Sequence, residues 1–573
     1  MTKTSNVRID TRYGWSKHSN GETTLWIKGY VYGVPDLKIF FDGLMPSLMD
    51  FDSTRIEEIL GKLDGNFGLV IQHRYGLLMA VDRIRSIPLF YVNRPEEVLV
   101  TDNPRAILQE LYKEEAAIDN AALLTLRMSG YCNGSGTLLS GLKQLQSGEY
   151  LIHSNQAATS VNSYYKYLSV PPAKTADRAD LKRELKHVTI NIIDKLIRSA
   201  NGRMIVVPLS GGYDSRVIAS GLAHRGYQNV RCFSYGKKNN YESKISRAVA
   251  EQLGFKWKFV HLDHQVIRTD FRSLEHNDYV SFADTLASVP VEHEYSAIRS
   301  LKESRWVDSD AIFINGMSGD FLTGAHIPKA FVEGLQDLSE ADRKKRILKS
   351  IVEKHYSLWD SLVTRNNTCL ISDLLWEELV EEVGGLPKDI NSDFAFYEFS
   401  EFKNRQTKYV ITVQRIYEFY GYEWRLPLWD KEYLDFWCKV PLEHKIDRNL
   451  FVEVMHEMDW GGVWMTNHPE PFISPRWIAL LRVLIKPLFV MLGKKRWKKF
   501  DKRFFYYWTE ILCKIAIIPY VTVVLDSRGF RNSVSWLTED YVLKLRSILN
   551  ESTFLTNPRF GRQPDTQSEY IKN

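Results

Sequence analysis

A strand pattern, a glycine turn and a helix pattern follow one another in residues 203–226, and this order sets the fold class that we expect. The β-formers of RMIVVPL lead into SGGYDS (210–215), which a helical pattern follows. Two more strand patterns, NVRCFSYG (229–236) and KWKFVHL (256–262), enclose the helical pattern YESKISRAVAEQLGF (241–255). Strands that alternate with helices are typical of a parallel α/β sheet.

The SGGYDS turn has the residue types of an anion site. In an open parallel sheet a ligand binds at the carboxyl ends of the strands, where the positive end of the next helix attracts an anion. Gly211 and Gly212 let the backbone bend closely around that anion, and Ser210 and Ser215 add hydroxyl donors. The carboxylate of Asp214 suits an anion only if Mg²⁺ lies between them. The turn therefore predicts a site for magnesium pyrophosphate, and it is no Walker A loop because GKS and GKT are absent.

The rest of the chain divides by pattern. The first 165 residues hold short alternating runs separated by turns, which predict an antiparallel β-rich domain with helices at 104–113 and 119–130. A linker is expected at 168–180, and the chain looks mostly helical after about residue 340. The polar tail from about 551 has the composition of a disordered segment.

Composition excludes several classes of protein. The five cysteines form no CxxC pair, which argues against zinc, iron–sulfur or disulfide frameworks and fits a reducing compartment. The start of the chain has no apolar secretory segment. The net charge is +5, and KKRWKKFDKR (494–503) holds seven cations and one aspartate, so the remainder is close to neutral. We therefore expect a cytoplasmic enzyme with one basic patch and no nucleic-acid partner.

Several stretches resemble known motifs. LSGGYDS resembles the pyrophosphate loop of the ATP pyrophosphatase (PP-loop) superfamily. The asparagine synthetase family is indicated by the stretches 232–254, INGMSGDFLTG (314–324) and YGYEWRLPLWDKEYLDF (420–436), the last of which is the most specific. LDGNFGLV, VDRIRSIPLFY and GTLLSGLKQLQSGEYL resemble that family's class II glutaminase domain. The resemblance covers roughly residues 25–455.

The resemblance implies a fold, a cofactor set and a reaction. The fold is α/β: a degenerate, β-rich glutaminase-like domain (1–167), a parallel-sheet ATP pyrophosphatase domain (180–460), and a helical basic and apolar extension with a polar tail (461–573). The cofactors are ATP and Mg²⁺, with Asp214 and Asp320 as metal ligands. The implied nucleotide-binding residues are Leu209, Ser210, Gly211, Gly212, Asp214, Ser215, Tyr235, Glu242, Gly316, Ser318 and Gly319.

The glutaminase half departs from the family pattern. The family nucleophile is a cysteine exposed when Met1 is removed, whereas Thr2 stands second here. The family N-G-E stretch, which grips glutamine, reads Lys28-Gly29-Tyr30. Glutamine would lose both polar partners, and a buried amide without partners is costly. We expect a structural remnant without glutaminase activity, although an N-terminal threonine can act as a nucleophile elsewhere.

The synthetase half departs too. Two acidic positions of the family's second loop are Met317 and Phe321. A family lysine after the signature, proposed to touch ATP phosphates, aligns near Phe451, and Lys445 or Arg448 are the available substitutes. These changes argue against aspartate as the substrate.

Glu423 and Arg425 of the signature are the candidate catalytic residues. In relatives that couple an internal amine, such as β-lactam synthetase, a Glu of this region works with a Tyr as the amine's base. Glu423 is the candidate base, with Tyr417 or Tyr409 as its partner. The alternative is a structural ion pair between Glu423 and Arg425 or another cation.

Residues 477–503 mix apolar faces with a basic end and have no counterpart in the family. They are too interrupted by charge and by Pro487 to span a membrane. Peripheral contact at the inner membrane face is one interpretation, with Trp477 and Trp497 at the headgroups and the lysines on anionic lipid. A buried helix pair with a solvated basic flank is the other.

The sequence favours an ATP-dependent ligase that activates a carboxylate as its acyl-adenylate, with AMP and pyrophosphate as products, for attack by ammonia or an amine. A sugar acid of a surface polysaccharide, including a lipid-linked one, is an attractive substrate because the asparagine synthetase-like group includes such members. The alternatives are an intramolecular amide former resembling β-lactam synthetase or lasso-peptide cyclase, and a nucleotide-binding scaffold without activity. An RNA-directed sulfur-transfer enzyme is disfavoured because it would need reactive cysteine pairs.

Overall fold

The computed structural model describes residues 4–48, 51–114, 117–154, 157–170, 177–333, 338–465, 476–489 and 493–549. The tail from 551, Thr2 and part of the expected linker lie outside these residues. Within them, no helix is both long and apolar enough to cross a membrane.

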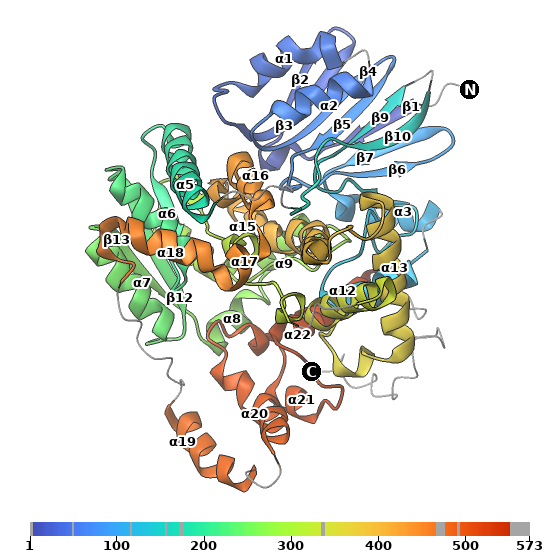
Figure 1. Ribbon diagram of the computed structural model, residues 1–573. Coiled ribbons are helices and arrows are strands. Elements are labelled where there is room, and N and C mark those ends of the chain that lie inside the picture. The colour runs from blue at the N-terminus through green and yellow to red at the C-terminus, as the bar shows by residue number, and fades with distance from the viewer. Residues whose placement is uncertain are drawn as a thin grey trace.

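The N-terminal part is built on two sheets, as its short alternating runs predict (Figure 1). One sheet has the strand order β10 (Ala157–Ser163), β9 (Glu149–Ser154), β5 (Gly76–Val81), β4 (Gly65–His73), β3 (Thr23–Val31) and β2 (Ser16–Asn20). The other has the order β1 (Thr4–Arg8), β7 (Glu97–Thr101), β6 (Phe90–Asn93) and β8 (Lys143–Gln144). All described strand pairs here are antiparallel except β1 with β7, which is parallel.

Helices complete this part. Apolar side chains of the six-stranded sheet pack against α1 and α2 in one core, which includes Phe41, Ile56 and Leu60. The helices of the N-terminal part are α1 (Leu37–Leu48), α2 (Ser53–Lys62), α3 (Leu108–Glu114) and α4 (Asn120–Ser129). The expected helix at 104–113 begins as a 3₁₀ turn, Pro104–Ile107, which Asn103 caps and which has proline at its first position.

The second part is the parallel sheet that the alternating pattern predicts. Its order is β13 (Lys256–His261), β12 (Val230–Gly236), β11 (Ile205–Pro208), β14 (Ile312–Ile314) and β15 (Glu423–Arg425), and every pair is parallel. The helices up to β15 are α5 (Arg178–Ala200), α6 (Tyr213–His224), α7 (Tyr241–Gln252), α8 (His264–Asp270), α9 (Leu274–Ala283), α10 (Tyr295–Glu303), α11 (Gly319–Leu322), α12 (Glu340–His355), α13 (Arg365–Val383), α14 (Asp393–Ser400) and α15 (Gln414–Phe419).

The remaining chain is helical, with α16 (Lys431–Lys439), α17 (Leu442–Lys445), α18 (Asn449–Met458), α19 (Arg476–Ile485), α20 (Lys494–Thr509), α21 (Tyr520–Leu525) and α22 (Ser533–Leu549). α19, α20 and α21 project from the end of the molecule opposite the N-terminal sheets, whereas α22 returns to the body (Figure 1). Tyr541 on α22 donates a 2.7 Å hydrogen bond to buried Asp284. One continuous apolar core joins the N-terminal sheets, the parallel sheet and α22.

Candidate functional site

The loop after β11 lies at the switch point of the parallel sheet. β11 has β12 on one side and β14 on the other, so the connections leaving it diverge and open a crevice at its carboxyl end. β11 ends at Pro208, and α6 begins at Tyr213 without a side-chain cap. The positive end of α6 is therefore available to an anion.

The two adjacent glycines of this loop lie close to neighbouring side chains. Neither has a positive φ, so the turn does not need their left-handed freedom. A Cβ on Gly211 would lie 3.1 Å from the Cδ1 of Ile245 on α7, and one on Gly212 would lie 3.3 Å from the Oγ of Ser210. Close packing at these two positions is one physical reason for glycine here.

A second loop, between β14 and α11, is pressed against the first. A Cβ on Gly316 would lie 2.5 Å from the carbonyl carbon of Asp214, and a Cβ on Gly319 would lie 2.7 Å from the Oδ1 of Asp214. These approaches are possible only for glycine, and they bring Asp320 next to Asp214. Each loop thus supplies one carboxylate to the same point, at the ends of neighbouring strands.

Both carboxylates have cationic partners within the chain. Arg448 forms an ion pair with Asp214, and His326 lies 3.2 Å from Asp320. Burial raises the pKa of Asp214 to about 6, against the opposing charge of Arg448. Burial also acts to raise the pKa of Asp320, but the hydrogen bond and charge of His326 outweigh it and hold that pKa below its usual value.

These loops border a cleft of about 380 Å³, a size typical of small-molecule sites. Predicted residues on its wall are Leu209, Ser210, Gly212, Asp214, Ser215, Tyr235, Glu242, Gly316, Ser318 and Asp320. Gly211 and Gly319 stand behind the wall, where they permit the close packing described above.

The signature residues Glu423 and Arg425 do not line this cleft. Glu423 is half exposed on β15 and pairs with Arg203 at 2.5 Å and with Arg425 at 2.9 Å. Arg425 is buried, with its guanidinium carbon 4.1 Å from the ring centre of Tyr30 in the N-terminal part. This geometry favours the structural ion pair over the role of Glu423 as a base.

Glu294 is a cleft residue that the sequence reasoning missed. It is buried just before α10 and accepts hydrogen bonds of 2.5 Å from the Tyr417 hydroxyl and 3.4 Å from the Tyr235 hydroxyl. Burial raises the pKa of Glu294 to about 7. The ring of His293 lies 3.9 Å away, and burial lowers the pKa of His293 to about 3. No motif surrounds Glu294 in the sequence, so only tertiary contacts identify it.

A π-helix, η6 (Glu401–Gln406), forms the opposite wall and supplies Arg405 and Gln406 to the cleft. Such local widening of a helix often occurs at functional sites. The buried carboxylate of Glu401 lies 2.5 Å from the Nδ1 of His326 and 3.1 Å from the NH1 of Arg405. Glu401 therefore holds two cationic side chains at the side of the cleft where Asp320 lies.

The substituted family positions fall into two groups. Met317 lines the cleft, whereas Phe321 is fully buried beside Tyr167 and Trp429. Lys445 is also fully buried, where its Nζ lies 2.7 Å from Glu398, so it cannot reach a nucleotide. Arg448 is the substitute that reaches the loop, and its guanidinium lies 4.5 Å from the ring centre of Phe451.

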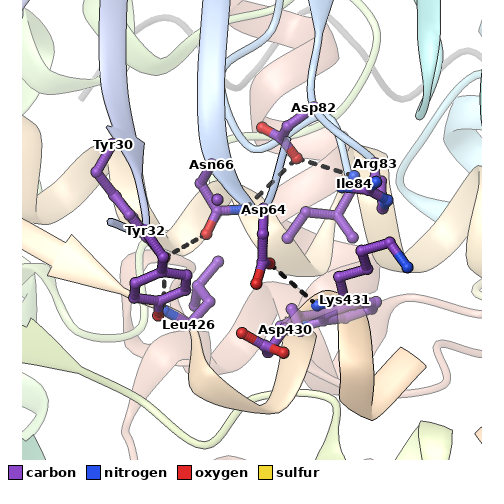
Figure 2. Close-up of a pocket in the computed structure, with 12 residues that line it drawn as sticks. Tyr30, Tyr32, Asp64, Asn66, Asp82, Arg83, Ile84, Leu426, Asp430 and Lys431 are labelled. Carbon is purple, nitrogen blue, oxygen red and sulfur yellow. Dashed lines mark hydrogen bonds between the residues drawn. The ribbon is translucent and has the colours of Figure 1, made fainter. Parts of the chain in front are cut away.

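Lys28 and Tyr30, which occupy the positions of the family's glutamine-binding stretch, contact the synthetase half of the chain. The Nζ of Lys28 lies 2.8 Å from Glu418, and both side chains are buried. The hydroxyl of Tyr30 donates a 2.5 Å hydrogen bond to Asn66 and accepts one of 3.4 Å from the backbone N–H of Leu426 (Figure 2).

Figure 2 shows the pocket left beside Tyr30, where Asp64, Asn66 and Asp82 face Leu426 and Lys431. Its space is about 10 Å³, which is room for no more than about one water molecule. Glutamine does not fit this pocket as it stands.

Comparison with protein families agrees with this arrangement. A model of the asparagine synthase family matches residues 197–457, and one of the glutamine amidotransferase domain matches residues 51–165. The chain therefore carries an asparagine synthase domain that follows a glutamine amidotransferase-like N-terminal domain. The asparagine synthase family consists of ATP-dependent, amide-forming ligases. The first match contains both loops of the cleft, Glu294 and Arg448.

Two solved structures are similar over part of the chain. One, titled as the allosteric regulatory enzyme of purine biosynthesis, is 11% identical with a TM-score of 0.18, over 42% of this chain and 60% of its own. The other, the glutamine phosphoribosylpyrophosphate amidotransferase of B. subtilis with ADP and GMP, is 11% identical with a TM-score of 0.17, over 52% and 62%. The chain thus covers less than two thirds of the length of either structure. The comparison with curated proteins finds no match.

Proposed function

We propose that this chain uses ATP to activate a substrate carboxylate as its acyl-adenylate, and then transfers the acyl group to ammonia or an amine. The products are pyrophosphate, AMP and an amide. The observation that carries the proposal is the contact of the two glycine loops, which brings Asp214 and Asp320 together at the uncapped start of α6. This is the place where a parallel sheet binds phosphates.

The first step needs a binding site for the departing pyrophosphate. The amino end of α6 and the hydroxyls of Ser210 and Ser215 offer donors to its oxygens. Arg448, already at the loop through Asp214, takes the place of the missing family lysine. Fixed donors and cations stabilise developing negative charge and are usually the largest single contribution to such a reaction.

The residues at this point also fit Mg²⁺ on their chemistry. No group of three His, Cys, Asp or Glu in the described part of the chain could hold a metal alone. Asp214 and Asp320 provide two carboxylates, and Mg²⁺ usually takes one or two carboxylates together with phosphate oxygens and water. When bound there, the ion would neutralise charge on the phosphates. Arg448 and His326 lie beside these carboxylates and would add positive charge next to the phosphates.

The second step needs a group that takes the proton of the attacking amine. Glu294 meets this requirement because it lines the cleft, is buried and has a pKa raised to about 7. A base with a pKa near the working pH is the most effective. The proton passes to the Glu294 carboxylate either directly or through the Tyr417 hydroxyl, 2.5 Å away.

We propose further that the N-terminal domain is a structural remnant and that the nitrogen comes from outside the chain. Lys28 and Tyr30 bind the synthetase half where the family grips glutamine, and the pocket beside Tyr30 is too small for glutamine. Steady glutamate release from glutamine that disappears in Thr2→Ala would contradict this proposal.

The carboxylate to test first is a sugar acid. Aspartate is disfavoured because Met317 places an apolar side chain in the cleft at a position that is acidic in the family. The Asn315, Ser318 and Gln406 side chains also line the cleft and can pair with hydroxyl groups.

The test is ATP–pyrophosphate exchange with candidate acids, combined with detection of AMP. The wild type should form AMP and pyrophosphate with a suitable acid, and Asp214→Asn should lose at least about 100-fold in exchange. The circular dichroism spectrum of the variant should stay unchanged, since Asp214 lies at a cleft. Nucleotide binding without turnover for every acid and amine would instead support a scaffold, and exchange by Asp214→Asn at the wild-type rate would remove the loop assignment.

A further inference from the structure

α19 and the following 3₁₀ turn η11 (Lys486–Phe489) present apolar side chains to solvent. We call this set the apolar face: Trp477, Leu480, Leu481, Val483, Leu484 and Leu488. Leu480, Leu484 and Leu488 recur every four residues and are 61%, 61% and 72% exposed. Isolated exposed leucines are ordinary, but a helix whose apolar stripe faces water marks an interaction surface.

The other side of the same helix accounts for its attachment to the protein. Ile478 is buried, and Arg482 pairs with Asp501 of α20 at 2.7 Å. The ring of Phe489 lies 4.8 Å from that of Phe500. The helix pair expected from the sequence therefore exists, but it buries only one side of α19. The leucines and Val483 of the apolar face are left over after this packing, while Trp477 is half exposed and contacts the ring of Trp508 on α20, with ring centres 5.9 Å apart.

A dense positive charge adjoins the apolar face. The first turns of α20 carry five exposed cations, which we call the basic end: Lys494, Lys495, Arg496, Lys498 and Lys499. Asp501 is the single acidic residue between 476 and 503, and Arg482 already neutralises it. A partner for this surface must be apolar and anionic together. A second copy of the chain is a poor partner, because it would bring another basic end to the contact.

We infer that the apolar face and the basic end form a docking site for an anionic lipid bilayer. An amphipathic helix lies in the interface with its apolar face about 5–10 Å deep, and basic residues beside it pair with anionic headgroups. Trp477 occupies the end of the stripe, where its ring suits the headgroup level.

α20 links this docking site to the cleft. Its last turn is fixed to the parallel-sheet domain, since the Tyr507 hydroxyl accepts a 2.5 Å hydrogen bond from Arg268 on α8. Ile511, just beyond, accepts a 3.0 Å hydrogen bond from the backbone N–H of Lys237, and Leu512 lines the cleft. The helix has 16 residues and so is about 24 Å long. A bilayer bound at one end would lie roughly one such helix length from the reaction site.

The experiment is sedimentation of the full chain with vesicles of phosphatidylcholine alone or mixed with phosphatidylglycerol. We expect binding to the anionic vesicles that weakens as salt rises, because the Debye length falls from about 10 Å at 0.1 M to about 3 Å at 1 M. Changing Lys494, Lys495, Lys498 and Lys499 to Gln should weaken binding by about 100-fold or more, at roughly five-fold for each engaged cation. Leu480→Asp with Leu484→Asp should weaken it by a similar factor.

Matched controls come from the rest of the surface. Leu274→Asp changes a leucine that is 82% exposed on α9 and should leave vesicle binding unchanged. The same holds for a quadruple variant of exposed lysines elsewhere, with Lys62, Lys256, Lys345 and Lys349 changed to Gln. Quenching by brominated lipid should be smaller in Trp477→Phe than in wild type, because that indole enters the interface.

Three outcomes would overturn the inference. They are no binding to anionic vesicles at low salt, binding that both site variants retain in full, and binding that the surface controls lose as strongly as the site variants. A concentration-dependent dimer that Leu480→Asp with Leu484→Asp abolishes, without vesicle binding, would show that the face joins two copies. Vesicle binding needs no catalytic turnover, so its failure is distinguishable from failure of the proposed ligase activity.

Discussion

The Tyr417 hydroxyl donates a 2.5 Å hydrogen bond to the Glu294 carboxyl inside the cleft wall. Tyr417 belongs to α15 and Glu294 precedes α10, so the pair joins two segments that are far apart in the sequence. No Lys or Arg among the described residues forms an ion pair with Glu294, and His293 is neutral near pH 7. The pair is therefore a proton-accepting group, whereas the carboxylate of Glu423 is already held by two arginines.

Replacing Glu294 by Gln should slow amide formation by about 100-fold or more, the range typical of a lost general base. In the wild type, kcat/KM should fall as pH drops below about 7, because Glu294 then becomes protonated and cannot accept a proton. ATP–pyrophosphate exchange should change much less, since that step precedes amine attack. The measurements are the pH profiles of both rates.

Glu423→Gln is the matched control for this prediction, because Glu423 pairs with arginines outside the cleft. It should keep kcat within about two-fold of the wild type and retain the pH profile. If Glu423→Gln removes amide formation while Glu294→Gln does not, the assignment of the base to Glu294 is wrong.

Glu294 should also make stability depend on pH. Its pKa is about 7 in the fold against 4.5 when unperturbed, so the native protein binds more protons than the unfolded chain between these values. The contribution of Glu294 to the free energy of unfolding is therefore complete below pH 4.5. It falls by about 3 kcal/mol in total as pH rises to 7. Urea unfolding at several pH values should show a smaller decline in Glu294→Gln than in the wild type. An equal decline in both would refute the shift.

Arg448 and Lys445 should respond differently to substitution, because Arg448 is the proposed nucleotide contact and Lys445 belongs to a structural ion pair. Arg448→Gln should raise the KM for ATP about ten-fold or more, because it removes a cation at the phosphate loop, and Arg448→Lys should restore part of the loss. Lys445→Met should instead lower stability by about 3–5 kcal/mol, since it leaves the Glu398 carboxylate buried without its partner. Steady-state kinetics and urea unfolding distinguish the two. A Lys445→Met enzyme of full stability and raised KM would reverse the assignment.

The Lys28–Glu418 ion pair should stabilise the contact between the N-terminal part and the synthetase part. Lys28→Met leaves a buried carboxylate with Arg415 as its remaining cation at 2.8 Å, and it should cost about 3 kcal/mol of stability. Adding Glu418→Gln should lower stability further, because it leaves the buried Arg415 guanidinium without its carboxylate partner. Thermal unfolding of both variants measures this. Equal midpoints for Lys28→Met and the wild type would mean that the pair contributes nothing.

The sequence by itself determined the order of strands and helices, because periodicity and turn residues act over a few positions. Its strand, turn and helix pattern also placed Asp214 at the carboxyl end of a strand in a parallel sheet, whereas Asp320 was placed at the same site only through the family resemblance. Family resemblance named the reaction class, which the family match supports. The close packing of Gly211 against Ile245 cannot be seen in a local pattern.

Tertiary structure decided which charged side chains remain available for chemistry. Glu423 and Lys445 looked functional in the sequence but are held in ion pairs, whereas Glu294, without any motif, lies in the cleft. Tertiary structure also decided which side of α19 is exposed. α20 packs against one side of this helix, and the apolar face on the other side remains exposed. The local sequence determines the position of a side chain along a helix or strand. Its burial and its charged neighbours come from residues far apart in the chain, so only the packed fold determines them.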